Sequence, residues 1–262
     1  MRLPRWRPAL SGAIVAASTV AACETVPYTG RSQLQFMSPQ QESQLGVQAY
    51  QQTLAKARLS SDAAASAMVA RVGSRIAAVT GHPEYQWEYR LIQDDKQANA
   101  FALPGGKVAV YTGILPITRD ESGLAAVLGH EIGHVVARHG GERVSQQTLV
   151  NVGLETTMAA LSSGNPATVQ AVASLLGAGA TVGVLLPWSR AQESEADHIG
   201  LILMAKAGYD PHAARDLWLR MAAASQGSGR PPEFLSTHPS EPTRIRQIEA
   251  WIPEAMQSYR PH

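Results

Sequence analysis

His130-Glu131-Ile132-Gly133-His134 lies within a run of apolar residues that recur at helical spacing, and Asp120 is placed to cap that helix. Residues four apart lie about 40° from each other around a helix axis, so both imidazoles project from one face. Two such imidazoles can bind one zinc ion. Glu131 lies beside this face, where its carboxylate can hold a water molecule and accept its proton. The pentapeptide therefore predicts a zinc site with Glu131 as general base.

The apolar neighbours of this stretch indicate that the helix is buried. They include Leu128, Ile132 and Val135. A chance occurrence of the pattern on a surface helix is the alternative. Burying two imidazoles and a carboxylate without a partner would be costly, so the apolar neighbours favour a metal.

A catalytic zinc site needs a third protein ligand and an open coordination position. The segment SRAQESEAD, residues 189–197, offers two glutamates. Glu193 and Asp197 are four apart on one helical face, so Glu193 can bind zinc while Asp197 accepts a hydrogen bond from a ligand imidazole. Spacing favours Glu193 over Glu195 without excluding the latter, whose other role would be solvation or pairing with a basic residue. His139 leaves the ligand face, and a structural contact is expected for it.

Composition excludes several classes of function. The chain has 262 residues, of which 45% are hydrophobic and 16% are charged, with a formal net charge of +1. This charge balance gives no support to a nucleic-acid partner. The single Cys23 excludes an intramolecular disulfide, a zinc ribbon and iron-sulfur chemistry, which all need several thiolates.

The first residues are typical of an export signal. Arginines at positions 2, 5 and 7 precede an uncharged apolar stretch over residues 8–20, which is too short for a stable spanning helix. Val20-Ala21-Ala22-Cys23 resembles a bacterial lipobox, in which cleavage before the cysteine leaves that residue acylated. We therefore predict a lipoprotein signal peptide over residues 1–22 and an acylated N-terminus and tether over residues 23–37. An ordinary free or buried thiol is the alternative for Cys23.

The remainder, residues 38–262, is predicted to form one mostly helical α+β domain. Strands are expected over residues 87–92, 99–103 and 107–111, the last two as a hairpin around Pro104-Gly105-Gly106. They would form a small antiparallel sheet beside the helix of the HExxH stretch. Helices are expected over residues 38–57, 61–81, 120–141, 171–186, 189–207, 210–224 and 243–256, with Ser38, Ser61 and Asp120 as caps, a loop over residues 226–232 and a possible break at Pro253.

Four segments together carry a family resemblance. HEIGH at 130–134, SRAQESEAD at 189–197, NAFALPGG at 99–106 and STHPSEPTR at 236–244 resemble the gluzincin family of CAAX-type prenyl endopeptidases and HtpX-like proteases. Secreted bacterial members of the LoiP and BepA type are the most similar. The resemblance runs from about Thr25 to Trp251. It implies a zincin-like fold, one Zn²⁺ per chain, Glu193 as the third ligand and Asp197 as the residue that orients a ligand imidazole.

The resemblance also assigns roles outside the HExxH helix. It places His238 near the site, either as a donor to the oxyanion of the tetrahedral intermediate or as a group that closes the fourth zinc position at rest. Asn99, Ala100, Phe101 and Ala102 resemble the edge strand of the family, against which an extended peptide substrate would bind. An ordinary hairpin packed under the helix is the other interpretation. Arg244 is expected in a structural ion pair.

These observations predict a zinc endopeptidase, and the resemblance implies quality control of unfolded or misassembled envelope proteins. Its expected partners are such proteins and the membrane, through the lipid anchor. Because Asp does not follow Cys23, the similarity to Gram-negative lipoproteins favours the outer membrane, facing the periplasm. The alternative is a membrane-anchored chaperone or assembly factor with a structural or autoinhibited zinc site. The sequence does not predict an oligomeric state or a cleavage preference.

Overall fold

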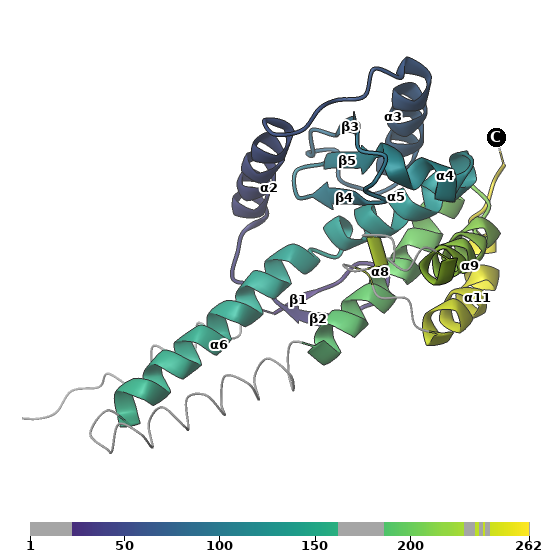
Figure 1. Cartoon of the computed structure of the whole chain (residues 1–262). Coiled ribbons are helices and arrows are strands. Elements are labelled where there is room, and N and C mark those ends of the chain that lie inside the picture. The colour runs from purple at the N-terminus through teal and green to yellow at the C-terminus, as the bar shows by residue number, and fades with distance from the viewer. Residues whose placement is uncertain (1–22, 162–185, 228–233, 236–237, 239–241, 262) are drawn as a thin grey trace, which may run out of the picture.

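The computed structural model describes residues 23–161, 186–227, 234–235, 238 and 242–261 (Figure 1). Helices dominate these residues, and a three-stranded sheet lies beside the helix that carries the HExxH stretch, which confirms the predicted α+β class. The described elements are β1 (Cys23–Thr25), β2 (Ser32–Leu34), α2 (Pro39–Leu54), α3 (Ala63–Ala77), β3 (Glu88–Ile92), β4 (Ala100–Leu103), β5 (Lys107–Tyr111), η2 (Thr112–Ile114), α4 (Leu115–Thr118), α5 (Glu121–Val136), α6 (His139–Leu161), α8 (Leu186–Lys206), α9 (His212–Gly227) and α11 (Pro242–Met256).

Side-chain caps start three of these helices. Ser38 and Gln41 form a reciprocal capping box at α2, as predicted. The Asp120 carboxylate accepts a hydrogen bond from the amide of Gly123 at 2.8 Å, which confirms the predicted start of α5. At α3 the prediction of Ser61 was wrong, because Asp62 accepts the hydrogen bond from Ala65. α11 continues through Pro253 as a single helix.

α5 is the central helix of the domain. Its apolar residues leave almost no surface exposed, and Leu124, Val127, Leu128 and Ile132 are each 0% exposed. α5 contacts α3, α8, α9 and β4, so the HExxH helix is surrounded by other elements as its apolar neighbours predicted. Burial on several sides holds this helix in one orientation.

α5 and α8 meet at a close crossing. A Cβ atom on Gly200 would lie 2.8 Å from the backbone carbonyl carbon of Gly129 and from the amide nitrogen of His130. A Cβ atom on Gly133 would lie 2.8 Å from the carbonyl oxygen of Ala196. Real Cβ atoms do not approach backbone atoms this closely, so small residues are required on both helices.

The three-stranded sheet has the order β3-β5-β4. β4 and β5 pair antiparallel, with Ala100 opposite Val110, which confirms the predicted hairpin. β3 instead pairs parallel to β5, so the sheet that we expected to be antiparallel is mixed. A parallel pair needs a crossover rather than a tight turn, and local strand patterns do not distinguish the two. β4 lies at an edge of this sheet, next to α5.

α5 ends sooner than predicted, at Val136 instead of near residue 141. Arg138 has a φ of 57°, a left-handed conformation that interrupts the helix. Its guanidinium pairs with Glu42, with Nη2 to Oε1 at 2.7 Å, and donates to the carbonyl oxygen of Met37 at 2.7 Å. It also pairs with Glu24. These long-range contacts hold Arg138 in place, and the chain restarts as α6 at His139.

The segment expected to be a tether forms a two-stranded hairpin. β1 and β2 pair antiparallel, with Cys23 opposite Leu34, and lie beside α6 and α8 (Figure 1). Beyond the hairpin, the amide of Phe36 donates to the hydroxyl of Ser145 on α6 at 2.8 Å. The sequence of the predicted tether shows no clear hydrophobic periodicity. Packing against the domain therefore orders this segment.

Some predictions fall outside the described residues. These are the signal peptide over residues 1–22, the helix over residues 171–186 apart from Leu186, and most of the loop over residues 226–232. Within the described ranges, no helix combines the length and apolar character that a membrane crossing requires.

Gly200→Ala tests the close crossing of α5 and α8. The added methyl group would press on the backbone of α5, and we expect a loss of about 1–3 kcal/mol of unfolding free energy, as for other overpacked interiors. Chemical denaturation measures it. Gly140→Ala is the matched control, because a Cβ atom there meets nothing within 4 Å and alanine is the better helix former. Equal stability of the two variants would contradict the crossing.

Candidate metal centre

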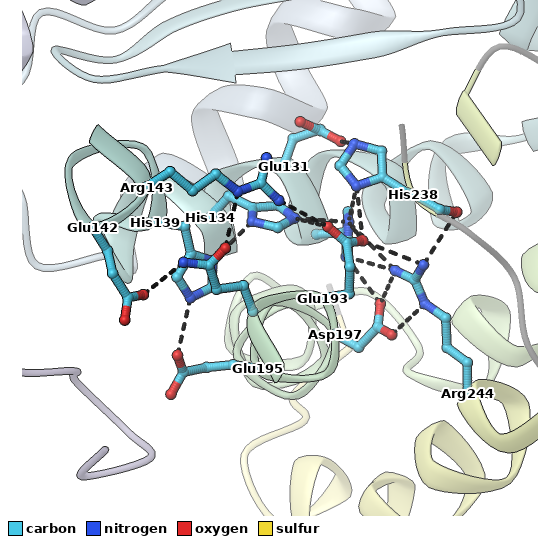
Figure 2. Close-up of polar contacts among 12 residues, drawn as sticks. Glu131, His134, His139, Glu142, Arg143, Glu193, Glu195, Asp197, His238 and Arg244 are labelled. Carbon is cyan, nitrogen blue, oxygen red and sulfur yellow. Dashed lines mark hydrogen bonds and ion pairs between the residues drawn. The ribbon is translucent and has the colours of Figure 1, made fainter. Parts of the chain in front are cut away.

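Four potential metal ligands from three segments gather at one point. His130 and His134 come from α5, Glu193 from α8, and His238 from the segment before α11. Figure 2 shows His134, Glu193 and His238 pointing toward one another. One donor atom of each lies within 4.8 Å of the others. The structure thus brings together the three predicted ligands and His238.

Glu193 faces both histidines of the HExxH stretch. Its Oε2 lies 3.4 Å from Nε2 of His130, and its Oε1 lies 3.3 Å from Nε2 of His134. The two Nε2 atoms are 3.1 Å apart. Oε1 is buried and accepts no hydrogen bond within the described part of the chain. A buried acceptor of this kind, beside two imidazole nitrogens, fits a zinc ion well.

The charge states of these groups also fit a metal. Burial lowers the pKa of His134 to about 3, so its imidazole is neutral. Burial alone would raise the pKa of Glu193, but its polar contacts with His130, His134 and His238 outweigh it and hold that pKa well below its usual range. Zinc binds neutral imidazole and ionised carboxylate, which are the forms favoured here.

Asp197 lies against His130, the contact that its predicted role requires. Its Oδ1 lies 2.9 Å from Nδ1 of His130, on the side of the ring away from the other ligands. Arg244 then donates to both oxygens of Asp197, from Nε at 2.5 Å and from Nη2 at 2.8 Å. The guanidinium carbon of Arg244 lies 3.6 Å from the centre of the Trp218 ring. The expected structural ion pair of Arg244 is therefore confirmed, and it neutralises a buried carboxylate.

Glu131 provides a second buried carboxylate beside the ligands. Its Oε1 lies 3.2 Å from Nε2 of His238 and accepts no hydrogen bond within the described residues. Burial would raise the pKa of Glu131, but the charge of His238 outweighs it and keeps that pKa below its usual range. An ionised carboxylate at this position is suited to take a proton from water.

His238 lies between two carboxylates, Glu131 and Glu193 (Figure 2). Its Nδ1 is 2.8 Å from Oε2 of Glu193. Burial would lower the pKa of His238, but the two carboxylates outweigh it and raise that pKa to about 9. The structure thus places His238 directly at the site.

His139 and Glu195 lie behind His134 rather than among the ligands (Figure 2). Nδ1 of His139 is 2.8 Å from Nδ1 of His134, and Nε2 of His139 is 2.9 Å from Oε2 of Glu195. The structural role predicted for His139 is confirmed. Glu195 pairs with Arg31, so the pairing with a basic residue that was one of its expected roles is also confirmed. The sequence contained no signal for Arg31 itself, since its partners lie more than a hundred residues away.

The other predicted residues lie away from the ligands. Ala100, Phe101 and Ala102 belong to the edge strand β4, and Asn99 precedes it. The amide of Phe234, four residues before His238, donates to the carbonyl oxygen of Ala98 at 3.0 Å, so this end of β4 adjoins the site. Cys23 is exposed in β1. Substrate binding by the strand and acylation of the cysteine remain predictions.

Two histidines and a glutamate facing one point, with an ionised carboxylate beside them, define a metallopeptidase site on a mostly helical α+β fold. Comparison with known proteins then identifies the family. Residues 63–252 match peptidase family M48, and the chain belongs to that family. It is a zinc metalloendopeptidase, which confirms the zinc cofactor and the resemblance.

The chain is similar to proteases of two kinds. It is 41% identical over 250 residues to mitochondrial metalloendopeptidase OMA1 of Schizosaccharomyces pombe, covering 93% of this chain and 72% of that protein. It is 34% identical over 252 residues to mitochondrial OMA1 of Bos taurus, covering 89% of this chain and 46% of that protein. It is 32% identical over 234 residues to the beta-barrel assembly-enhancing protease of Yersinia pestis, covering 86% of this chain and 46% of that protein. The chain thus spans about half the length of the latter two.

Asp197→Asn tests the support of the metal centre. Asparagine keeps an acceptor for His130 but removes the carboxylate charge that Arg244 contacts through two hydrogen bonds. We expect zinc affinity to fall about 10- to 100-fold, the range typical for partners of metal-binding histidines. Competition with a chromogenic chelator measures it. Asp216→Asn, which removes a half-exposed carboxylate paired with its neighbour Arg215, should bind zinc normally. Unchanged affinity in Asp197→Asn would show that this carboxylate does not support the metal.

Proposed function

We propose that this chain hydrolyses peptide bonds within unfolded or misassembled proteins of the cell envelope. The observation that carries the proposal is the buried carboxylate of Glu131, which lies beside the ligand group with an acceptor oxygen free of hydrogen bonds from described residues. Family membership supports peptide hydrolysis. The name of the Yersinia pestis relative, which associates it with assembly of β-barrels, supports the choice of envelope proteins.

His130, His134 and Glu193 would hold the zinc, which when bound acts as a Lewis acid toward water and the scissile carbonyl group. Glu131 orients the attacking water, accepts its proton at a carboxylate oxygen and delivers that proton to the leaving amine. Asp197 keeps the imidazole of His130 turned so that Nε2 faces the other ligands. Close packing around α5 excludes bulk water from the back of the site and fixes these groups.

β4 is the proposed binding strand for the substrate. It lies at an edge of the sheet, adjoins α5, and connects through Ala98 and Phe234 to the segment that carries His238. An extended peptide could add to this edge by backbone hydrogen bonds, which depend little on side chains. This mode of binding suits a peptidase for unfolded chains of varied sequence.

His238 closes the resting site in this proposal. It is in contact with Glu131 and Glu193 at once, so it occupies the position where water would contact the base. Its nitrogen also belongs to the group of four donors that could surround one ion. A substrate would then have to displace His238 before it could be cleaved. Proteolysis would therefore be limited to chains that bind at the site strongly enough to do so.

The location of the protein is part of the proposal. The lipobox-like residues before Cys23 and the exposure of that cysteine support a lipid anchor. Anchoring in the outer membrane, facing the periplasm, would place the site near envelope proteins during their assembly. The S. pombe and Bos taurus relatives are mitochondrial by name.

Glu131→Gln tests the proposed general base. Glutamine cannot accept the proton, so we expect cleavage of an unfolded protein by the purified full chain to fall at least about 100-fold, consistent with the usual contribution of general bases. Zinc content should be unchanged. Gel electrophoresis and metal analysis measure the two properties. Glu121→Gln, on the same helix but paired at the surface with Arg71, should keep full activity.

Chelation should also abolish cleavage by the unmodified chain, and added zinc should restore it. A Glu131→Gln variant that still cleaves would contradict the assigned base. If neither protein cleaves although zinc is bound, the chaperone or assembly role becomes the better explanation, and the contact of His238 with both Glu131 and Glu193 is the observation that favours it.

His238→Ala separates closure from participation in catalysis. If His238 closes the site, its removal exposes the fourth coordination position of the zinc. We then expect the cleavage of unfolded protein to accelerate several-fold. His212→Ala, at an exposed histidine at the start of α9, should change nothing. Initial rates at equal zinc content are the measurement. A large decrease in rate would instead identify His238 as a donor to the oxyanion.

A further inference from the structure

We infer that Arg31, on the N-terminal hairpin, is a positioning residue for the metal ligand His134 and acts on it through Glu195 and His139. The inference rests on His134 as a ligand, not on the identity of the substrates. It makes the hairpin of residues 23–34, which follows the predicted anchor, part of the support of the metal centre.

The first step is the orientation of His134. Its Nε2 faces Glu193 at 3.3 Å and Nε2 of His130 at 3.1 Å. For Nε2 to offer its lone pair to a metal, the ring hydrogen must be on Nδ1. Nδ1 lies 2.8 Å from Nδ1 of His139, which can accept that hydrogen. His139 therefore selects the tautomer of His134 that binds metal.

The second step fixes His139 in turn. Because its Nδ1 accepts, its Nε2 carries the hydrogen, which it donates to Oε2 of Glu195 at 2.9 Å. His139 is 1% exposed and Glu195 is 6% exposed, so water competes little for this bond. Arg31 contacts the same carboxylate, which is the acceptor of this bond.

The third step is Arg31, which holds Glu195 in place. Nε of Arg31 donates to Oε2 of Glu195 at 2.8 Å. Its two terminal nitrogens donate to the two oxygens of Glu142 on α6, at 2.7 and 2.8 Å. One guanidinium thus joins two buried carboxylates on different helices, a geometry that a lysine cannot reproduce. The hydroxyl of Thr29, on the same hairpin, also donates to Glu195.

The two histidine ligands are supported in parallel ways. His130 is backed by Asp197 and then by Arg244 of α11. His134 is backed by His139, then Glu195, then Arg31. Each series ends in an arginine that neutralises a buried carboxylate. The two arginines lie near opposite ends of the chain. Partners of metal-binding histidines affect metal affinity. In the series behind His134 this effect reaches the hairpin through one residue more than in the series behind His130.

Arg31→Gln tests the inference in the full chain. We expect zinc affinity to fall about three- to tenfold, less than for a direct partner of a ligand, and Arg31→Lys to recover only part of the loss. The visible spectrum of the cobalt-substituted protein should change as well, which a purely structural defect elsewhere would not produce. Glu24→Gln is the matched control, because it removes another ion pair of the hairpin, to Arg138, that does not lead to His134.

A second measurement uses the unmodified chain and so does not depend on a variant that folds. Coupling between two sites is reciprocal, so removal of zinc should loosen the hairpin. We expect chelation to accelerate amide hydrogen exchange in residues 23–34 while α3 stays protected. Zinc-independent exchange in the hairpin, or normal zinc affinity and cobalt spectrum in a folded Arg31→Gln protein, would overturn the inference. Zinc affinity is measured without proteolysis, so failure here is distinguishable from failure of the proposed function.

Discussion

The site depends on how closely α5 approaches α8. Gly129 and Gly133 on one helix lie against Ala196 and Gly200 on the other, with no room for a larger side chain. At this separation the carboxylate of Glu193 reaches both histidines of α5, and Asp197, one helical turn further along α8, reaches the far nitrogen of His130. A wider crossing would separate the ligands even if every one of them were present. The small residues at the crossing are therefore as necessary to the metal centre as the ligands themselves.

Close packing creates an electrostatic problem, because carboxylates and imidazoles are buried together. Isolated buried charges are strongly destabilising, and the buried carboxylates behind the ligands, Glu142, Glu195 and Asp197, each have an arginine partner. Arg244 from α11 neutralises Asp197, and Arg31 from the N-terminal hairpin bridges Glu142 and Glu195. Segments near both ends of the chain thus complete a centre built by two interior helices. Arg31 also lies before residues 63–252, the part that matches the family.

Glu131 and the ligand Glu193 both face His238, and Oε2 of Glu193 also lies 3.4 Å from Nη1 of Arg244. In the proposed function the substrate displaces this histidine, whereas His130 and His134 are fixed within α5. The proposed arrangement combines a rigid set of ligands with one displaceable neighbour. It also lies beside the edge strand β4, where an extended chain can add without a demand for particular side chains. A fixed set of catalytic groups next to a binding strand with little sequence preference suits a peptidase whose activity is restrained until a substrate binds.

Sequence alone determined the features that repeat over one helical turn or act between neighbours. The four-residue spacings of His130 with His134 and of Glu193 with Asp197, and the caps Ser38 and Asp120, follow from local helix geometry, which tertiary packing preserved. Choosing Glu193 over Glu195 needed the family resemblance as well. Tertiary structure decided the parallel pairing of β3 with β5, the early end of α5 at Arg138, and the ordering of the hairpin through Arg31. Arg31 and Glu195 are 164 residues apart, and contacts at such separations depend on how whole elements pack, for which no local pattern exists.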